Sequence, residues 1–484
     1  GTWGGGVFLS TNNGTSWTEV NTGLKNTNVN HNGLAGGSAV AQDVVTVDTR
    51  TVLWTLSGNP IGINFNYLRD DNHNRPAGSP SIQSIMKQMN IQWVRYPGGE
   101  KSDWHFFSTP PYTKADPKVL TYNKGWGVYY DSVNNQDVLD FDEYIHYLSE
   151  FGGHAYVVVP YESYKRSNKT KEEFIEHAVA WVRYANIQKN YGVMYWEIGN
   201  ENWTHTTGTA AEIAQVAKEF AQAMKAIDPN IKVGCSGNSR QWFETLLDVA
   251  GEELDFVTVS NYCRLKDFEY YRSTENVILD GSARNAAQAI KESPHKDRVK
   301  VIVAEFGAIT WSKTWPDKND LGHAIVSFDI AGQLLCNNSV EYAMLWGTRY
   351  MEGELEKNWY ALGKRNEILP AGRPLAIWGR FLKSEMVKAS GPEYSRCFAS
   401  VDPRTQTLTV FVINKDTAVR RIRIEVGATS YFRTADIYHF VGTGEADMKP
   451  TWSKITTMDV STNILDDVEL RGTSITVIDM RASD

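Results

Sequence analysis

This sequence has few cysteines, and it lacks long apolar runs and clusters of basic residues. Only 4 of its 484 residues are cysteines, at positions 235, 263, 336 and 397. No two of them have Cys-x-x-Cys spacing, which argues against a disulfide scaffold and against a zinc ribbon. No apolar stretch approaches the about 20 residues that span a bilayer, so we expect no membrane insertion.

The charge balance is mildly acidic, with 49 Lys and Arg against 57 Asp and Glu. No basic run stands out, so nucleic acid is not an expected partner. No cluster of His and Asp ligands follows the predicted strands, and we expect neither a metal nor a cofactor. The chain begins without a signal peptide, and we expect that one was removed or lies outside this sequence, because the expected location is extracellular or periplasmic.

What is present is the composition of a folded protein too long for one ordinary core. The chain is 42% hydrophobic and 22% charged, which is typical of globular proteins. Its length suits a barrel with a smaller second domain. The 16 tryptophans could stack on sugar rings or simply fill the core.

Short apolar segments alternate with helical patterns through the middle of the chain. Eight of them begin at Ile61, Ile91, His154, Val193, Ile231, Asp255, Val299 and Tyr342. Helical spacing between two of them is kept by Ile213, Val216, Ala217, Phe220, Met224 and Ile227. Eight alternations over about 320 residues predict an α/β protein with a (β/α)8 TIM barrel.

The pattern changes toward both ends, which predicts four regions. Residues 1–35 contain one turn, at 10–17, that resembles an Asp-box, and we expect a linker or the remnant of a neighbouring module. Residues 36–58 should join the C-terminal domain as strands, and residues 59–384 should form the catalytic barrel. Residues 385–484 lose the helical pattern and alternate at 407–412 and 422–426, which predicts an accessory antiparallel β-sandwich.

Two glutamates follow strands of the predicted barrel. The fourth strand breaks at Gly199, which places Asn200 and Glu201 at the barrel mouth, and Glu305 closes the apolar seventh strand. Active sites of such barrels lie at these strand ends, where carboxyl groups can act as proton donor or nucleophile. The structural alternatives are a solvated loop glutamate and a buried glutamate paired with an arginine.

These motifs resemble those of clan A of the glycoside hydrolases. Trp196-Glu197-Ile198-Gly199-Asn200-Glu201 is similar to the acid/base signature of the clan, and Ala304-Glu305-Phe306-Gly307 is similar to its nucleophile motif. The resemblance covers roughly residues 60–484 and implies a retaining double displacement without cofactor, with Glu201 as acid/base and Glu305 as nucleophile.

Other strand ends extend the resemblance. Residues 95–99, Arg-Tyr-Pro-Gly-Gly, are similar to a motif of the α-L-arabinofuranosidase family. The resemblance implies that Arg95 keeps Glu305 ionised, that Tyr262 donates a hydrogen bond to it, and that Trp346 lies beneath the sugar. An ion pair or core packing remains the alternative for each of these three.

Two positions depart from that family. Residues 63–67 contain no acid where arabinofuranosidases have one, and Asn261 stands where they have histidine. Further sugar contacts are expected from side chains on strand ends and loops, namely Asn200, Asn64, Asn66, Trp104, Glu162, Trp203 and Trp311.

The sequence thus predicts a retaining glycoside hydrolase that acts on a plant or algal cell-wall polysaccharide or oligosaccharide. The aromatic residues near the predicted mouth favour endo-action, as in the β-agarase and porphyranase type of clan A enzyme. The alternatives are an exo-acting α-L-arabinofuranosidase and a catalytically silent barrel that binds carbohydrate.

Overall fold

The computed structural model describes residues 43–107, 138–166, 169–204, 208–350, 357–428 and 431–482, together with two pairs of short strands. One pair, β1 (Phe8–Leu9) and β2 (Thr18–Glu19), runs antiparallel within a separate unit formed by residues 1–43. The other pair is β6 (Tyr130–Asp131) and β7 (Gln136–Asp137). The Asp-box-like turn at 10–17 lies outside the described residues.

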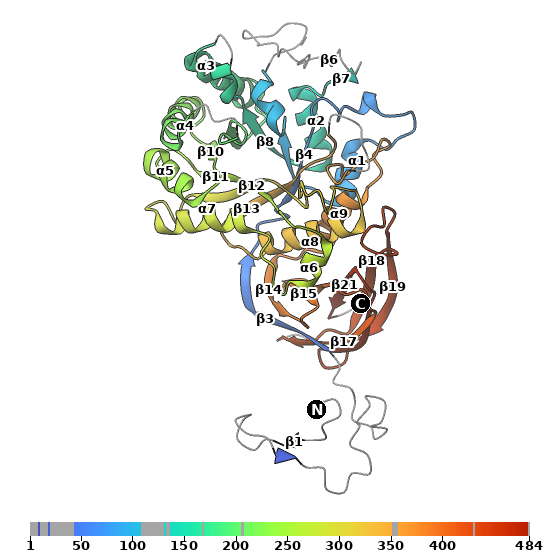
Figure 1. The fold of residues 1–484 in the computed structure, drawn as a ribbon. Helices are drawn as coiled ribbons and strands as arrows, with labels where there is room; N and C mark the ends of the chain where they lie inside the picture. Colours follow the sequence, from blue (N-terminus) through green and yellow to red (C-terminus); the bar gives the residue numbers. More distant parts are fainter. Residues whose placement is uncertain are drawn as a thin grey trace. The chain divides into compact units, whose positions relative to one another are not determined.

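Eight parallel strands close into a barrel within residues 44–484 (Figure 1). Each strand begins within two residues of the position that the sequence predicts. In order around the barrel they are β4 (Ile61–Asn64), β5 (Trp93–Tyr96), β8 (His154–Val159), β9 (Tyr195–Ile198), β10 (Lys232–Ser236), β11 (Phe256–Tyr262), β12 (Lys300–Gly307) and β13 (Val340–Leu345). The strand β13 pairs with β4 and closes the ring.

Helices connect the strands on the outside of the barrel. A side chain at the N-terminus often fixes where a helix begins, as Thr209 does for α4 by accepting from the Glu212 N–H. The α-helices are α1 (Ile82–Met89), α2 (Phe141–Phe151), α3 (Lys171–Val182), α4 (Ala210–Lys225), α5 (Arg240–Ala250), α6 (Phe268–Ser273), α7 (Gly281–Glu292), α8 (Leu321–Leu335) and α9 (Arg373–Phe381). Shorter turns are η1 (Asn72–Asn74), η2 (Glu100–Trp104), η3 (Glu162–Arg166), the π-helical η4 (Arg183–Gln188) and η5 (Pro370–Gly372).

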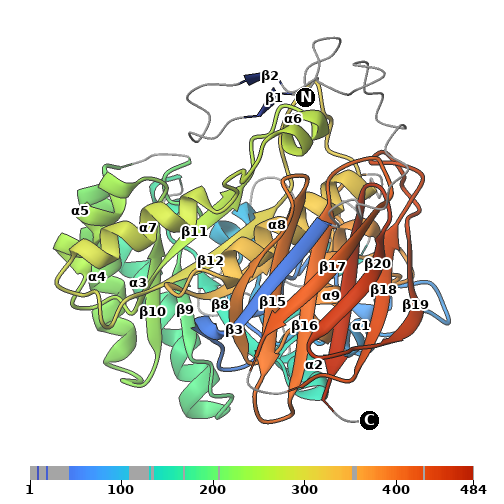
Figure 2. The same ribbon diagram turned by 90° about the horizontal axis from the view of Figure 1, so that it is seen from below.

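The second layer is a nine-stranded, largely antiparallel sheet (Figure 2). Its order is β19 (Thr451–Asp459), β18 (Thr434–Val441), β21 (Ser474–Arg481), β16 (Thr407–Asn414), β15 (Ser395–Asp402), β14 (Glu385–Ser390), β3 (Asp43–Thr55), β17 (Arg420–Gly427) and β20 (Ile464–Leu470). His439 on β18 contacts the carbonyl of Glu469 on β20, with 3.1 Å between Nε2 and O. Because these strands are far apart in the order, the sheet curls over itself and encloses a core of its own.

The sheet packs on the barrel through α8. In β16 successive side chains point to opposite faces, so Phe411 and Ile413 join the barrel core while Val410 and Val412 join the core of the sheet. Every residue of α8 is buried, because this helix lies between the two layers. The expected fold class, a (β/α)8 barrel with an accessory antiparallel β-sandwich, is confirmed; the domain boundaries stay a prediction.

Candidate active site

Arg95 at the end of β5 ties together the strand ends at the barrel mouth. The side chain is only 1% exposed. Its Nε donates to Glu197 at 2.8 Å, Nη1 donates to Asn64 at 3.0 Å and to Glu305 at 2.9 Å, and Nη2 donates to Asn200 at 2.7 Å. Burial alone would lower the pKa of Arg95, but the carboxylates of Glu197 and Glu305 raise it above its usual value. The guanidinium is therefore a permanent positive charge at this point.

Glu305 on β12 is held from both of its oxygens. Oε1 accepts from Arg95, and Oε2 accepts from the hydroxyl of Tyr262 at 2.5 Å. Glu305 is only 4% exposed, and it lines a cavity at the barrel mouth. Burial, and then the charge of Glu305, raise the pKa of Tyr262, so this hydroxyl keeps its proton and remains a donor. Glu305 is thus oriented as a hydrogen-bond acceptor facing the cavity.

Glu201 lies in the same cavity but in a different electrostatic environment. Burial, followed by the charge of Glu305, raises the pKa of Glu201 to about 7. A hydrogen bond from Ser260 and the charge of Arg95 oppose this shift only in part. Glu305 therefore has the permanent positive charge of Arg95 beside it, whereas Glu201 holds a proton near neutral pH. This asymmetry separates a nucleophile from a general acid.

The backbone around Glu201 explains why a glutamate projects into the cavity there. Gly199 and Glu201 have left-handed φ angles of 68° and 43°, the second of which is unfavourable for a side-chain-bearing residue. Asn202 stabilises the turn, since its N–H donates to Ser236 Oγ at 3.0 Å and its Nδ2 donates to the Ile198 carbonyl at 2.9 Å. A Cβ on Gly199 would lie 2.2 Å from Asn202 Oδ1, so this tight turn requires glycine.

The cavity has a volume of about 260 Å³. Of the residues predicted to be functional, six line it: Asn200, Glu201, Tyr262, Glu305, Trp311 and Trp346. Six more described residues line it that the sequence did not single out as sugar contacts: Gly99, Glu100, Lys101, Ile309, Tyr350 and Trp359. Trp311 is 56% exposed and packs edge to face on Tyr262, with 5.1 Å between ring centroids.

The loop after β5 also lines the cavity. Gly98 and Gly99 have φ angles of 74° and 68°, and a Cβ on Gly99 would lie 2.1 Å from the ring of Trp346. Lys101 follows them in η2, and its Nζ lies 4.8 Å from the centroid of the Trp346 ring. The indole that the resemblance places beneath a sugar thus carries an ammonium group over its ring.

Asn64 and Asn66 serve the framework rather than the cavity. The amide of Asn64 donates to the carbonyls of Ala304 and Leu345, and its oxygen accepts from Arg95. The amide of Asn66 donates to the Arg349 carbonyl, and its oxygen caps the following turn. Neither side chain is among the described residues that line the cavity, and their polar atoms bond to main-chain groups and to Arg95.

Trp104, Glu162 and Trp203 also lie apart from the described cavity lining. Glu162 is 1% exposed and stands beside Asp103, whose Oδ1 accepts from the N–H groups of Tyr161 and Glu162. Burial, and then the charge of Glu162, raise the pKa of Asp103 to about 8. Asp103 also accepts from the Asn200 N–H. The buried pair of Asp103 and Glu162 therefore stabilises the turn that carries Asn200 and Glu201.

Glu197 is a functional neighbour to which sequence reasoning gave no role. It is 1% exposed, and its second oxygen accepts from Thr258 Oγ1 at 2.7 Å. Its position offered a signal, because a glutamate at the centre of an apolar barrel strand requires a buried partner. That partner is Arg95, which therefore lies between two carboxylates.

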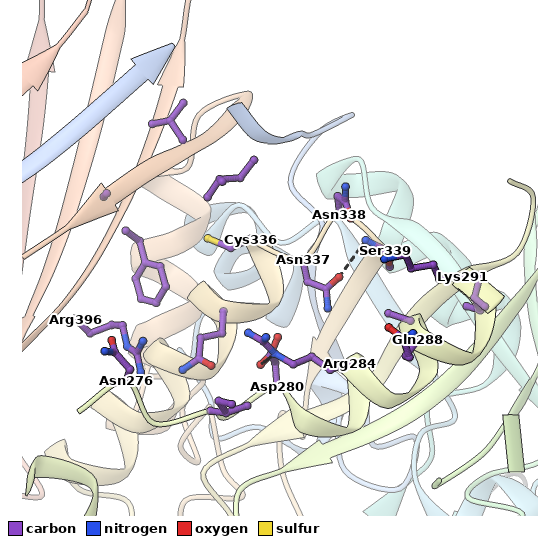
Figure 3. A pocket seen from close by; sticks show the side chains of 18 of the residues that line it. Asn276, Asp280, Arg284, Gln288, Lys291, Cys336, Asn337, Asn338, Ser339 and Arg396 are labelled. Carbon is purple, nitrogen blue, oxygen red and sulfur yellow. Dashed lines mark hydrogen bonds and ion pairs between the residues drawn. The ribbon is translucent and has the colours of Figure 1, made fainter. Parts of the chain in front are cut away.

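A second, larger hollow of about 1020 Å³ lies between α7, α8 and the sheet (Figure 3). Its two arginines are paired, Arg284 with Asp280 at 2.6 Å and Arg396 with Asp329 at 3.3 Å. It lies away from the strand ends that carry Glu201 and Glu305. Its size alone gives it no chemistry.

The described residues also include one cluster with metal-ligand geometry, formed by Asp71, His73 and Glu143. Asp71 Oδ1 already accepts from His73, and the carboxylate of Glu143 accepts from the N–H of Asp140 at the start of α2. These contacts explain the cluster as helix and turn capping. Among the described residues, each helix is too short or too polar to cross a bilayer.

Sequence comparison places the chain near the arabinofuranosidases. The profile of the α-L-arabinofuranosidase 1 domain matches residues 85–280. The intracellular exo-α-(1→5)-L-arabinofuranosidase of Acetivibrio thermocellus is 23% identical over 227 residues, 42% of this chain and 41% of that protein. The exo-α-(1→6)-L-arabinofuranosidase of Bifidobacterium longum is 23% identical over 294 residues, which is 52% of each. The chain thus spans about two fifths to one half of these curated relatives.

Solved structures share the fold over more of the chain. The α-L-arabinofuranosidase of Thermotoga maritima, solved with arabinose, superposes with a TM-score of 0.73 at 19% identity, over 91% of this chain and 100% of that one. A family 44 xyloglucanase of Paenibacillus polymyxa superposes with a TM-score of 0.61 at 13% identity, over 91% and 100%. The chain is a relative of the clan A glycoside hydrolases.

These comparisons correct one interpretation drawn from the sequence. Several of the arabinofuranosidase relatives are named as exo-acting enzymes, so they favour the exo-acting alternative over the endo-acting agarase or porphyranase type. Several are named intracellular, and the extracellular location stays a prediction that they do not support.

Proposed function

We propose that this clan A relative is a retaining, exo-acting glycoside hydrolase that releases terminal α-L-arabinofuranosyl groups, with Glu305 as nucleophile and Glu201 as acid/base. The observation that carries the proposal is the asymmetry of the two carboxyl groups in one cavity. Glu305 accepts from Arg95 and Tyr262, while the pKa of Glu201 is raised to about 7.

In the first step Glu305 attacks the anomeric carbon as Glu201 donates its proton to the leaving oxygen. The carboxylate forms a glycosyl-enzyme ester, and the aglycone departs as an alcohol. In the second step the same Glu201, now a carboxylate, takes a proton from water, which displaces Glu305 from the sugar. Arg95 and Tyr262 donate hydrogen bonds to Glu305 as its charge returns.

Two observations support exo-action. The cavity of about 260 Å³ is slightly smaller than the usual ligand site of about 300–1,000 Å³, which suits a terminal sugar better than the interior of a polymer. The relatives with matching sequence include proteins named exo-arabinofuranosidases.

The decisive experiment is NMR analysis of products from 4-nitrophenyl α-L-arabinofuranoside and from arabino-oligosaccharides. We expect free arabinose as the product, released first as the α-anomer, and no activity in Glu305→Gln. A first-formed β-anomer would overturn the retaining mechanism, and a ladder of oligosaccharides would overturn exo-action. If neither substrate gives a product, the alternative of a catalytically silent barrel that binds carbohydrate is supported instead.

A further inference from the structure

Lys101 is a buried cation in the proposed catalytic cavity to which the proposed reaction gives no task. It is 4% exposed and lines the cavity together with Glu201 and Glu305. Its Nζ lies over the ring of Trp346, and within the described part of the chain it forms no ion pair. Burial lowers the pKa of Lys101 to about 8, although the charges of Glu305 and Asp70 oppose the shift.

The nearby carboxylates are already engaged by other groups. Glu305 accepts from Arg95 and Tyr262. Asp70 accepts from Thr348, Arg349 and the Asn66 N–H. Removing an ammonium group from water without an anionic partner is costly, so a buried lysine that faces a cavity is best explained by an anion that arrives there with the ligand.

A second polar donor lines the same cavity. Trp359 lines the cavity, and its indole Nε1 is buried without a hydrogen-bond acceptor among the described residues. The Trp359 ring packs edge to face on Tyr350, which is also a lining residue, with 4.8 Å between centroids. Lys101 and Trp359 together offer N–H donors with unused capacity, while Glu100, an exposed lining residue, has contacts of its own.

The charge of Lys101 also conflicts with a fully neutral substrate. The transition state of glycoside hydrolysis has oxocarbenium character, so positive charge develops on the sugar ring. A nearby ammonium group destabilises that charge unless an anion on the substrate neutralises the ammonium.

We propose that Lys101 forms an anion subsite in the catalytic cavity and that the sugar on the leaving side of the scissile bond carries a carboxylate or a sulfate group. This proposal rests on the proposed function, because a terminal arabinofuranosyl group carries no ionisable group and the anion must then belong to the ring to which it is attached. Carboxylate and sulfate oxygens both accept charge-assisted hydrogen bonds from an ammonium group.

The kinetic test uses three arabinofuranosides that differ only in the leaving sugar: glucose, glucuronate and glucose 6-sulfate. We expect the wild-type protein to cleave an acidic member with a kcat/KM about 10- to 100-fold above that of the neutral one. Lys101→Met should remove most of this ratio, because it lowers kcat/KM for the acidic member and raises it for the neutral one, whose developing positive charge no longer faces an ammonium group. Lys101→Arg, which keeps the charge, should retain part of it.

Lys232→Met is the matched control. Lys232 also lies over an aromatic ring, 4.9 Å from the Tyr195 centroid, but it begins β10 at the opposite end of the barrel from the cavity. It should keep the full ratio between acidic and neutral substrates. A preference for glucuronate alone or for glucose 6-sulfate alone identifies which anion the subsite takes.

Direct binding separates this proposal from the proposed function. Titration of the wild-type protein with glucuronate, glucose 6-sulfate and glucose, followed by calorimetry, needs no hydrolysis. Anion binding that Lys101→Met abolishes, in a protein that cleaves no arabinofuranoside, would sustain the subsite and overturn the proposed function. Equal cleavage of all three arabinofuranosides, or equal loss on all three in Lys101→Met, would overturn the subsite alone. A protein that neither binds these anions nor cleaves any of the arabinofuranosides would overturn both proposals.

Discussion

The residues that line the proposed catalytic cavity form two sets, called walls below, whose polar groups are satisfied in different ways. The strand-end wall consists of Asn200, Glu201, Tyr262 and Glu305. Arg95 donates to Asn200 and Glu305, Tyr262 donates to Glu305, and Glu201 has a hydrogen bond with Ser260. The loop wall consists of Gly99, Glu100, Lys101, Tyr350 and Trp359, together with Trp346, which follows β13 and contacts this loop. On this wall Lys101 Nζ and Trp359 Nε1 have no acceptor among the described residues.

The difference separates chemistry from recognition. Groups that act on the reacting atoms must be oriented before the substrate arrives, and a dense hydrogen-bond network does this. Groups that select a substrate can remain unsatisfied until the ligand supplies their partners, so that a ligand lacking those partners is rejected. Changes in the strand-end wall should therefore impair every substrate alike, whereas changes in the loop wall should alter the choice among substrates.

The largest effect is expected for Glu305→Gln. An amide is a poor nucleophile, so kcat should fall by about 10⁴-fold or more on every arabinofuranoside. Glu341→Gln is the control, since this glutamate accepts from Tyr195 and Lys232 away from the cavity; it should leave kcat unchanged. Similar losses of kcat in both variants would mean that Glu305 is not the nucleophile and that the strand-end wall does not carry the chemistry.

Glu201→Gln should come next, with a loss of about 10²- to 10⁴-fold on poor leaving groups. Because burial and Glu305 raise the pKa of Glu201 to about 7, the acid is protonated below that pH and loses its proton above it. The kcat/KM of the wild-type protein should thus fall as the pH rises through about 7, and the variant should lack this alkaline limb. An unchanged limb in the pH profile of Glu201→Gln would assign it to another group.

Tyr262→Phe removes one hydrogen bond to Glu305 and keeps the ring. We expect kcat to fall by about 10- to 100-fold, by the same factor for acidic and neutral substrates. Tyr271→Phe, which removes a buried hydroxyl that donates to Asp329, should change the melting temperature but not kcat. A substrate-dependent effect of Tyr262→Phe would show that the strand-end wall also selects substrates.

The smallest effect is expected for Trp359→Phe, which removes the indole N–H from the loop wall. The kcat/KM for acidic arabinofuranosides should fall by about 3- to 10-fold while the neutral substrate is unaffected. Trp452→Phe is the control, because that tryptophan stacks on Tyr438 in the sheet. An equal loss on acidic and neutral substrates would place Trp359 with the packing of the loop rather than with recognition.

Sequence reasoning singled out Glu201 and Glu305 because each of them follows or ends a barrel strand, and Arg95 and Tyr262 because their strand-end motifs resemble those of clan A. Parallel strands in a closed barrel end on the same side, so residues far apart in the chain become neighbours once the strand count is right. The same reasoning missed Lys101 and assigned Asn64 and Glu162 to the sugar. A polar side chain near the mouth can bond either to a ligand or to main-chain groups, and its residue type does not distinguish the two.

By itself the sequence determined the alternation of strands and helices, the barrel and the paired glutamates at its mouth, because hydrophobic periodicity and glycine breaks are local properties. Only the tertiary structure decided that Arg95 lies between Glu197 and Glu305 and that Glu201 lines the same cavity as Glu305. It also decided that Lys101 lines this cavity, with its ammonium group over the ring of Trp346. The reason is physical: burial, hydrogen-bond partners and the charges that shift a pKa come from residues brought together by folding, not from neighbours in the chain.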